Sequence, residues 1–248
     1  MLSLGWLPIV WLRTAAVALI LYVLFPYLSL NLKKFALKFK LSQLHVYYAM
    51  IAFWELVTVG IILYLLKINN LPLSAIGLTG SLSPTAIVYV VIGVIISAGL
   101  YPLIQAFGKI IGWDMFWHRR KDTDWFPRDV GYLSTKREVA SMFLIVVISI
   151  PILEEIIYRG YVFTALLQNF DNIFLVFILT SLIFASIHCL AGPGFMLYIF
   201  LGTFIPSFLY WKFGSIYPCI LLHSLNTFIG EIIIPLVEKE GKIKPRRR

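Results

Sequence analysis

The sequence predicts an all-α integral membrane protein, a polytopic bundle with about seven transmembrane helices. Of its 248 residues, 60% are hydrophobic and only 13% are charged, whereas soluble domains carry about 25% charged residues. The apolar residues gather in runs of about 17–25 residues, the length that a helix needs to cross a bilayer. Because no repeat or long polar segment divides the chain, we expect residues 1–248 to form a single integral membrane domain.

The predicted spans share an apolar composition and are separated by short polar segments. They are residues 6–30, 46–66, 85–107, 138–164, 172–190, 195–211 and 214–236. The first run contains Arg13 and lacks a small-residue cleavage site, so we expect a retained helix and not a signal peptide.

The net charge of +9 comes from basic residues that concentrate at 33–40, 109–137 and 239–248. Basic residues between apolar runs are typical of cytoplasmic loops, so they indicate membrane orientation and not nucleic-acid binding. Seven spans then place the N-terminus outside and the C-terminus in the cytoplasm, with the basic tail on anionic lipid headgroups. The compact size and the absence of organellar signals favour a prokaryotic cytoplasmic membrane.

The fourth run continues without a strong breaker, except Pro151, to Leu167. About thirty residues make a helix of about 45 Å, longer than the hydrocarbon core of about 30 Å. It must therefore tilt, kink or protrude, and Pro151 favours a kink just before Glu154. Residues 169–172 form a turn-like tip, so the fourth and fifth runs should pair as an antiparallel hairpin.

Two adjacent acids, Glu154 and Glu155, lie inside this apolar run. An ionised carboxylate in a bilayer costs several kcal/mol, so such residues mark functional sites by default. Glu155 and Arg159 are four residues apart and share one helix face, in the orientation that favours an ion pair. Glu154 is rotated by about 100° from Glu155 and is left as the candidate general base. A Glu–Arg pair that only joins helices is an equally good interpretation of this segment alone.

Two histidines lie at compatible depth. His188 follows Phe184 by four residues, which places the two rings on one helix face. Glu154 and His188 are both about 24 to 27 Å from the hairpin tip. His223 precedes Asn226 and Thr227 by three and four residues, so all three can face one cavity and donate to an oxyanion. Taken separately, each histidine is also explained as an interhelical hydrogen-bond partner.

A zinc site remains open, because Glu154, His188 and His223 are a plausible set of three ligands. No His-Glu-x-x-His segment occurs, which disfavours a zinc protease of the site-2 type. The chain also lacks a Gly-x-Ser-Gly stretch and paired intramembrane aspartates. A proton-coupled transporter is a further alternative, but no inverted repeat supports it.

The order Glu154-Glu155-x-x-x-Arg159, then Phe184-x-x-x-His188, then His223 with a following amide, resembles the CPBP family. These intramembrane proteases include CAAX prenyl protease type 2 and bacterial bacteriocin-processing or Abi-like immunity proteins. The resemblance covers the second half of the chain and implies a catalytic core over residues 138–236.

The resemblance implies a glutamate-dependent intramembrane endopeptidase, of a family formerly classed as metalloproteases, that needs no metal cofactor. Its substrate would be a hydrophobic peptide, either prenylated at a CAAX end or carrying a leader or signal sequence. Glu154 and His188 would activate a water, and His223 and Asn226 would stabilise the oxyanion.

The other residues of the motifs would support this site. Glu155 and Arg159 would hold its shape, with Phe184 beside His188. The family's third motif usually has Asn or Asp four residues after the histidine, where this chain has Thr227. Three alternatives follow, in order of preference: Asn226 supplies the amide instead, Thr227 donates, or activity is reduced. An inactive relative that binds peptides or lipids is the alternative function.

Overall fold

The computed structural model of the chain describes residues 43–112, 136–234 and 236. Within these residues every regular element is helical and none is a strand, which confirms the predicted fold class for this part of the chain. The first predicted span at 6–30, most of the basic segment 109–137 and the basic tail lie outside the described residues.

The first two described helices match the second and third predicted spans. Helix α3 covers Gln43–Ile68 and helix α4 covers Pro84–Ile110. Ser83 caps α4, because its hydroxyl accepts a hydrogen bond from the amide of Ala86 at 3.1 Å. A short 3-10 turn, Leu73–Ile76, lies between the two helices.

The central element of the fold is a long helix from Lys136 to Asn169, of which the apolar part Val139–Asn169 has 31 residues. It agrees with the helix of about thirty residues that the sequence predicts. Its hydrogen bonding alternates between α and π patterns, and its segments in order are α5 (Lys136–Met142), Phe143–Ser149 (π), α6 (Ile150–Glu155), Ile156–Phe163 (π) and α7 (Thr164–Asn169). Pro151 lies in the first turn of α6. The two π-helical segments therefore flank Glu154 and Glu155, and such segments are frequent at functional sites.

The predicted hairpin is present. Helix α7 ends at Asn169, and α8 covers Ile173–Ser186. The side chain of Asn172 accepts hydrogen bonds from the amides of Phe174 at 3.0 Å and Leu175 at 3.2 Å, so it satisfies two donors that the helix start leaves open.

Helix α8 is shorter than the predicted span 172–190. It has 14 residues and ends at Ser186, so His188 lies in the connection that follows and not within a helix. That connection contains the 3-10 turn Cys189–Ala191 and then Gly192, whose φ of 99° suits a glycine. Proline at the next position begins a new helix, so two turns interrupt the predicted span although its composition stays apolar.

Two further helices complete the described chain. Helix α9 covers Pro193–Phe213, and α10 covers Tyr217–Phe228 and continues as a π-helical segment, Ile229–Ile233. Four of the described helices are long and apolar enough to cross a membrane, namely Tyr48–Ile68, Pro84–Ile110, Val139–Asn169 and Pro193–Phe213. The predicted number of about seven spans is therefore not confirmed.

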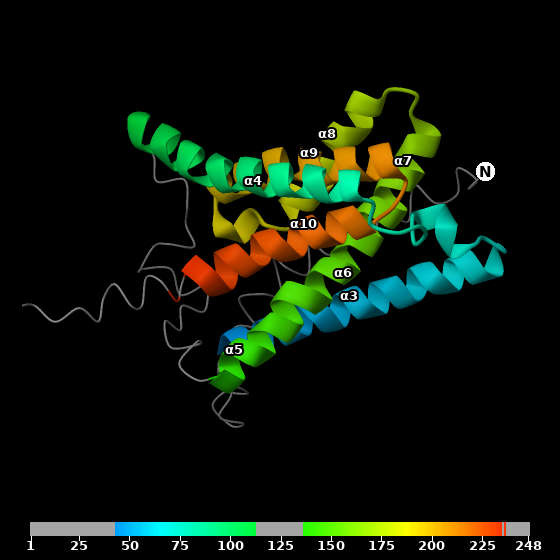
Figure 1. Ribbon diagram of the computed structural model, residues 1–248, viewed down its shortest axis with the longest axis horizontal. Helices are drawn as coiled ribbons and strands as arrows, with labels where there is room; N and C mark the ends of the chain where they lie inside the picture. The colour runs from blue at the N-terminus through cyan, green and yellow to red at the C-terminus, as the bar shows by residue number, and fades with distance from the viewer. Residues whose placement is uncertain (1–42, 113–135, 235, 237–248) are drawn as a thin grey trace, which may run out of the picture.

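The central helix lies between α3 and the other helices (Figure 1). Helices α8, α9 and α10 contact it on the side away from α3, and α4 packs on α9 and α10. Many large apolar side chains of α3 and α4 face outward, for example Ile95 and Leu103. An outward apolar surface with a polar interior is the arrangement expected in lipid, and the interior groups form the site described below.

The cap at the hairpin tip gives a test of the local structure. Replacing Asn172 by alanine should destabilise the protein by about 1 kcal/mol, because two amides at the start of α8 lose their acceptor. Unfolding in detergent micelles measures the change. Aspartate at this position keeps an acceptor and should behave as the wild type; equal losses in both variants would contradict the assigned cap.

Candidate active site

The two adjacent glutamates of α6 are buried. Glu154 is 6% exposed, Glu155 is 0% exposed, and Arg159, one turn later, is 1% exposed. Charged groups at such positions are stable only when they are paired and hydrogen-bonded. The interactions of these side chains therefore decide what the site can do.

Glu155 accepts two hydrogen bonds on one oxygen. Its Oε1 lies 2.9 Å from Nη1 of Arg159 and 2.8 Å from Nδ1 of His223. The first contact is the ion pair that the sequence predicts. Because arginine is always charged, its partner is the ionised carboxylate, which can only accept hydrogen bonds. Nδ1 of His223 must therefore carry a proton and donate it to Glu155.

His223 also faces the other glutamate. Its Nε2 lies 3.5 Å from Oε2 of Glu154, so one imidazole ring stands between the two acids. This separation is longer than a direct hydrogen bond of 2.7–3.2 Å. The His223 side chain is 21% exposed, whereas both glutamates are buried, so the ring is the most accessible member of the group. When His223 carries two protons, the charges of the four groups sum to zero.

Phe184 of α8 packs against the polar groups from the side. The guanidinium carbon of Arg159 lies 5.0 Å from the centre of its ring. The imidazole of His188 is 5.1 Å away and that of His223 is 6.1 Å away, and the ring of Tyr158 lies 4.6 Å from the same Phe184 ring. Phe184 thus joins the central helix, the two histidines and α8 in one cluster.

His188 keeps the ring contact with Phe184 although α8 has ended two residues earlier. Its amide hydrogen-bonds to the carbonyl of Ala185 at 3.0 Å, and its Nδ1 lies 3.1 Å from the carbonyl oxygen of Phe184. A carbonyl only accepts hydrogen bonds, so Nδ1 donates and a neutral ring has its lone pair on Nε2. His188 can therefore accept a hydrogen bond from a water or substrate through Nε2.

Asn226 and Thr227 lie on α10, less than two turns beyond His223, and both are half-buried. Among the residues that the structure describes, neither side chain forms a hydrogen bond or ion pair. Their donors are thus not engaged by the protein, as the assignment of Asn226 to an oxyanion requires.

The zinc hypothesis finds no matching ligand geometry. Within residues 43–112 and 136–234, no group of three or more His, Cys, Asp or Glu side chains is arranged to hold a metal ion. Glu154, His188 and His223 therefore form no set of metal ligands within these residues.

Sequence reasoning missed the contact between Glu155 and His223. It assigned Glu155 to Arg159 alone, because residues four apart on a helix are neighbours by geometry. The partner from α10 is 68 residues away, and no spacing rule predicts which of two adjacent glutamates a distant histidine meets. Tyr158, which packs on Phe184, carried no signal beyond a general apolar pattern.

The chain was compared with known protein families. Residues 136–229 match a family model described as type II CAAX prenyl endopeptidase Rce1-like. This part of the chain is therefore similar to CAAX prenyl endopeptidases. The matched segment contains every candidate site residue. Together with the apolar helices, the match supports an integral membrane protein of a protease family.

The other two comparisons gave no relatives. No curated protein and no solved structure matches the chain. Residues 43–112, which form α3, α4 and the turn between them, lie outside the CAAX-protease match.

The buried pair gives a test of stability. Replacing Arg159 by methionine should destabilise the protein by about 3–5 kcal/mol, because it leaves the Glu155 carboxylate buried without its cation. Unfolding in detergent micelles measures this loss, and an added Glu155→Gln should recover part of it. The control is Lys212→Met, an exposed cation over the Tyr89 ring, which should cost at most about 1 kcal/mol. Similar losses in both single variants would contradict the pairing.

Proposed function

We propose that the protein is an intramembrane endopeptidase that cleaves hydrophobic or prenylated peptides with a water activated by Glu154. The observation that carries the proposal is the position of His223, whose Nδ1 is held by Glu155 while its Nε2 faces Glu154 at 3.5 Å. A water or a peptide carbonyl can meet both groups at this point. The CAAX-protease match supports peptide hydrolysis as the reaction.

Glu154 acts first as a general base. It takes a proton from a water whose oxygen attacks the carbonyl carbon of the scissile bond. Nε2 of His188 accepts the second hydrogen bond of that water, since its Nδ1 is occupied by the Phe184 carbonyl. The C–N bond then breaks, and protonated Glu154 returns its proton to the leaving amine. The products are a carboxylic acid and an amine, with no covalent enzyme intermediate.

The tetrahedral intermediate carries a negative oxygen that needs donors. His223 supplies Nε2–H when its ring is doubly protonated, a state in which the charges of Arg159, Glu155, Glu154 and His223 balance. Asn226 supplies an amide donor from the same helix. Donors of this kind, aimed where charge develops, contribute a large part of the rate in acyl transfer.

Glu155 and Arg159 take no part in proton transfer. Their ion pair holds the Nδ1 side of His223 and thereby turns Nε2 toward Glu154. The same division of work, in which a carboxylate orients a histidine, is familiar from hydrolytic triads. Lipids surround the outer faces of the helices, and an apolar or prenylated peptide can reach the site from this environment.

The role of Glu154 is tested by replacing it with glutamine. Cleavage of a fluorogenic prenylated CAAX peptide by the purified protein should fall by about 10²–10⁴-fold, because the amide cannot accept the proton. Asp171→Asn makes the same chemical change at the exposed hairpin tip and should cleave as the wild type.

The same assay after chelation, with metal analysis, separates the mechanisms. Cleavage that depends on Glu154 and survives metal removal is expected. Cleavage lost on chelation and restored by zinc would contradict the proposal, and so would a folded wild type that binds prenylated and leader peptides without cleaving either.

Asn226 and Thr227 can be told apart by substitution. Asn226→Ala should lower kcat by about 10²–10³-fold through the loss of an oxyanion donor. Thr227→Val, which removes the hydroxyl of the next residue with little change in volume, should lower it by less than about tenfold. Measured kcat and KM for both variants decide between them, and a larger effect at Thr227 would assign the donor to the threonine.

A further inference from the structure

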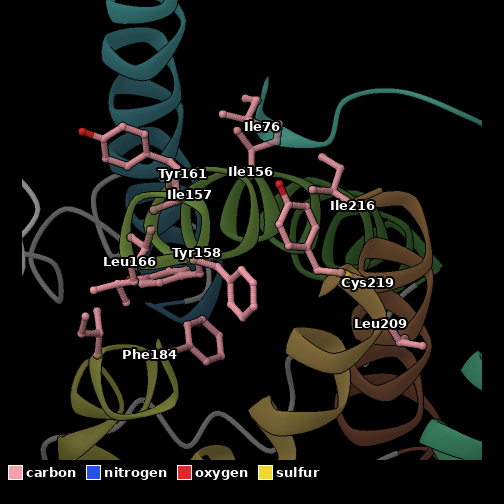
Figure 2. Packing of buried hydrophobic residues seen from close by; sticks show 14 of the residues in the cluster. Ile76, Ile156, Ile157, Tyr158, Tyr161, Leu166, Phe184, Leu209, Ile216 and Cys219 are labelled. Carbon is pink, nitrogen blue, oxygen red and sulfur yellow. The ribbon is translucent and has the colours of Figure 1, made fainter. Parts of the chain in front are cut away.

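The chain between α3 and α4 enters the helical bundle. We call residues 73–77 the inner turn; it comprises the 3-10 turn Leu73–Ile76 and the following Gly77. Ile76 is 0% exposed and belongs to the main apolar core together with Ile156 and Ile216. Figure 2 shows Ile76 extending from its turn to the helix that carries Ile156. The inner turn lies outside the residues that match the protease family.

The inner turn touches the central helix at Gly160, the residue after Arg159. A Cβ atom added at Gly160 would lie 2.9 Å from the carbonyl oxygen of Ile76 and 3.3 Å from its Cβ. Backbone therefore meets backbone, and no side chain fits between them without separating the two segments. Gly160 is part of the π-helical segment Ile156–Phe163, directly after the glutamates.

The inner turn also holds the connection between α9 and α10. The carbonyl oxygen of Gly77 accepts a hydrogen bond from the amide of Ile216 at 3.0 Å. Gly77 has a φ of +71°, and a Cβ there would overlap the ring of Tyr210. That ring cannot easily withdraw, because its hydroxyl is hydrogen-bonded to Thr164 of the central helix at 2.8 Å.

These contacts connect the two halves of the candidate active site. Ile216 is the residue before α10 begins, and His223 follows it by seven residues, about two helical turns. Gly160 is five residues after Glu155 on the central helix. The inner turn thus fixes the start of the helix that carries His223 against the helix that carries both glutamates.

We propose that the inner turn is the positioning element that holds His223 between Glu154 and Glu155, with Gly77 and Gly160 as its positioning residues. This inference rests on the proposed function for its kinetic consequences. The orientation that it assigns to His223 does not depend on that function. A displacement of about 1 Å at a catalytic group can cost about 100-fold in rate, so small shifts at this contact reach the chemistry.

The chain contains matched variants for the test. Gly160→Ala and Gly77→Ala add one methyl group where no space exists. Gly202→Ala is the control for Gly160, since it lies in helix α9 with no atom within 4 Å of the added Cβ. Gly80→Ala is the control for Gly77, since its φ is +82° and its Cβ also meets nothing within 4 Å. The variant and its control have similar backbone strain, but only the variant adds a methyl group against neighbouring atoms.

Two readouts are compared in the full-length protein. In peptide cleavage, Gly77→Ala and Gly160→Ala should lower kcat by about 10–100-fold with little change in KM, because positioning and not binding is affected. In NMR of protein labelled with ¹⁵N-histidine, the hydrogen-bonded Nδ1–H signal of His223 should weaken or shift. Gly80→Ala and Gly202→Ala should leave both readouts as in the wild type.

The outcomes separate this inference from the proposed function. If Gly77→Ala and Gly160→Ala keep the wild-type histidine signal, the positioning role is overturned whatever the activity. If the wild type cleaves nothing, the proposed function fails, and the histidine signal alone decides the inference. If both glycine variants fail to fold, Ile76→Ala is measured in their place, because it adds no atom. An unchanged His223 signal in that variant overturns the positioning role of the inner turn. Recovery of the signal in Gly77→Ala by an added Tyr210→Ala would confirm it.

Discussion

The arrangement of this site depends on one buried ion pair, between Glu155 and Arg159. Two charges can remain inside a membrane protein only if each neutralises the other. The pair lies on a single helix turn, so it forms with the helix and needs no other element to bring it together. Once Glu155 is fixed as an anion, it can only accept hydrogen bonds, and this determines which nitrogen of His223 carries the proton. One local interaction thus fixes the chemical state of a group from a distant part of the chain.

The site also depends on a backbone that departs from regular α-helix. The π-helical segments before and after Glu154 and Glu155 change which residues face a given neighbour. In the second segment, a glycine allows the inner turn to approach the helix directly behind Arg159. The residues proposed to hold the site together therefore come from both the matched segment and the inner turn between α3 and α4, although the acidic and basic groups of the site all lie in the matched segment.

Sequence patterns predicted the features that depend on neighbours in the chain. The all-α class, the long central helix, the hairpin at residues 169–172 and the pair of Glu155 with Arg159 all follow from composition or from spacing. The end of α8 was misplaced, since apolar composition continues past Ser186 into the turn that contains His188. The contacts of His223 with both glutamates and of Ile76 with Gly160 depend on helix packing, which no local pattern encodes. The roles of Glu154, His188 and Asn226 stay predictions.

The short length of α8 has a consequence for the surrounding lipid. Fourteen residues rise about 21 Å, which is roughly 9 Å less than the hydrocarbon core. A helix that is too short obliges the bilayer to thin beside it or brings polar surroundings inward to its end. His188 follows that end closely, so in a bilayer such a mismatch would bring headgroups and their hydration toward this residue. The proposed hydrolysis consumes water, and a short α8 would shorten the path of water from the headgroup region to the site.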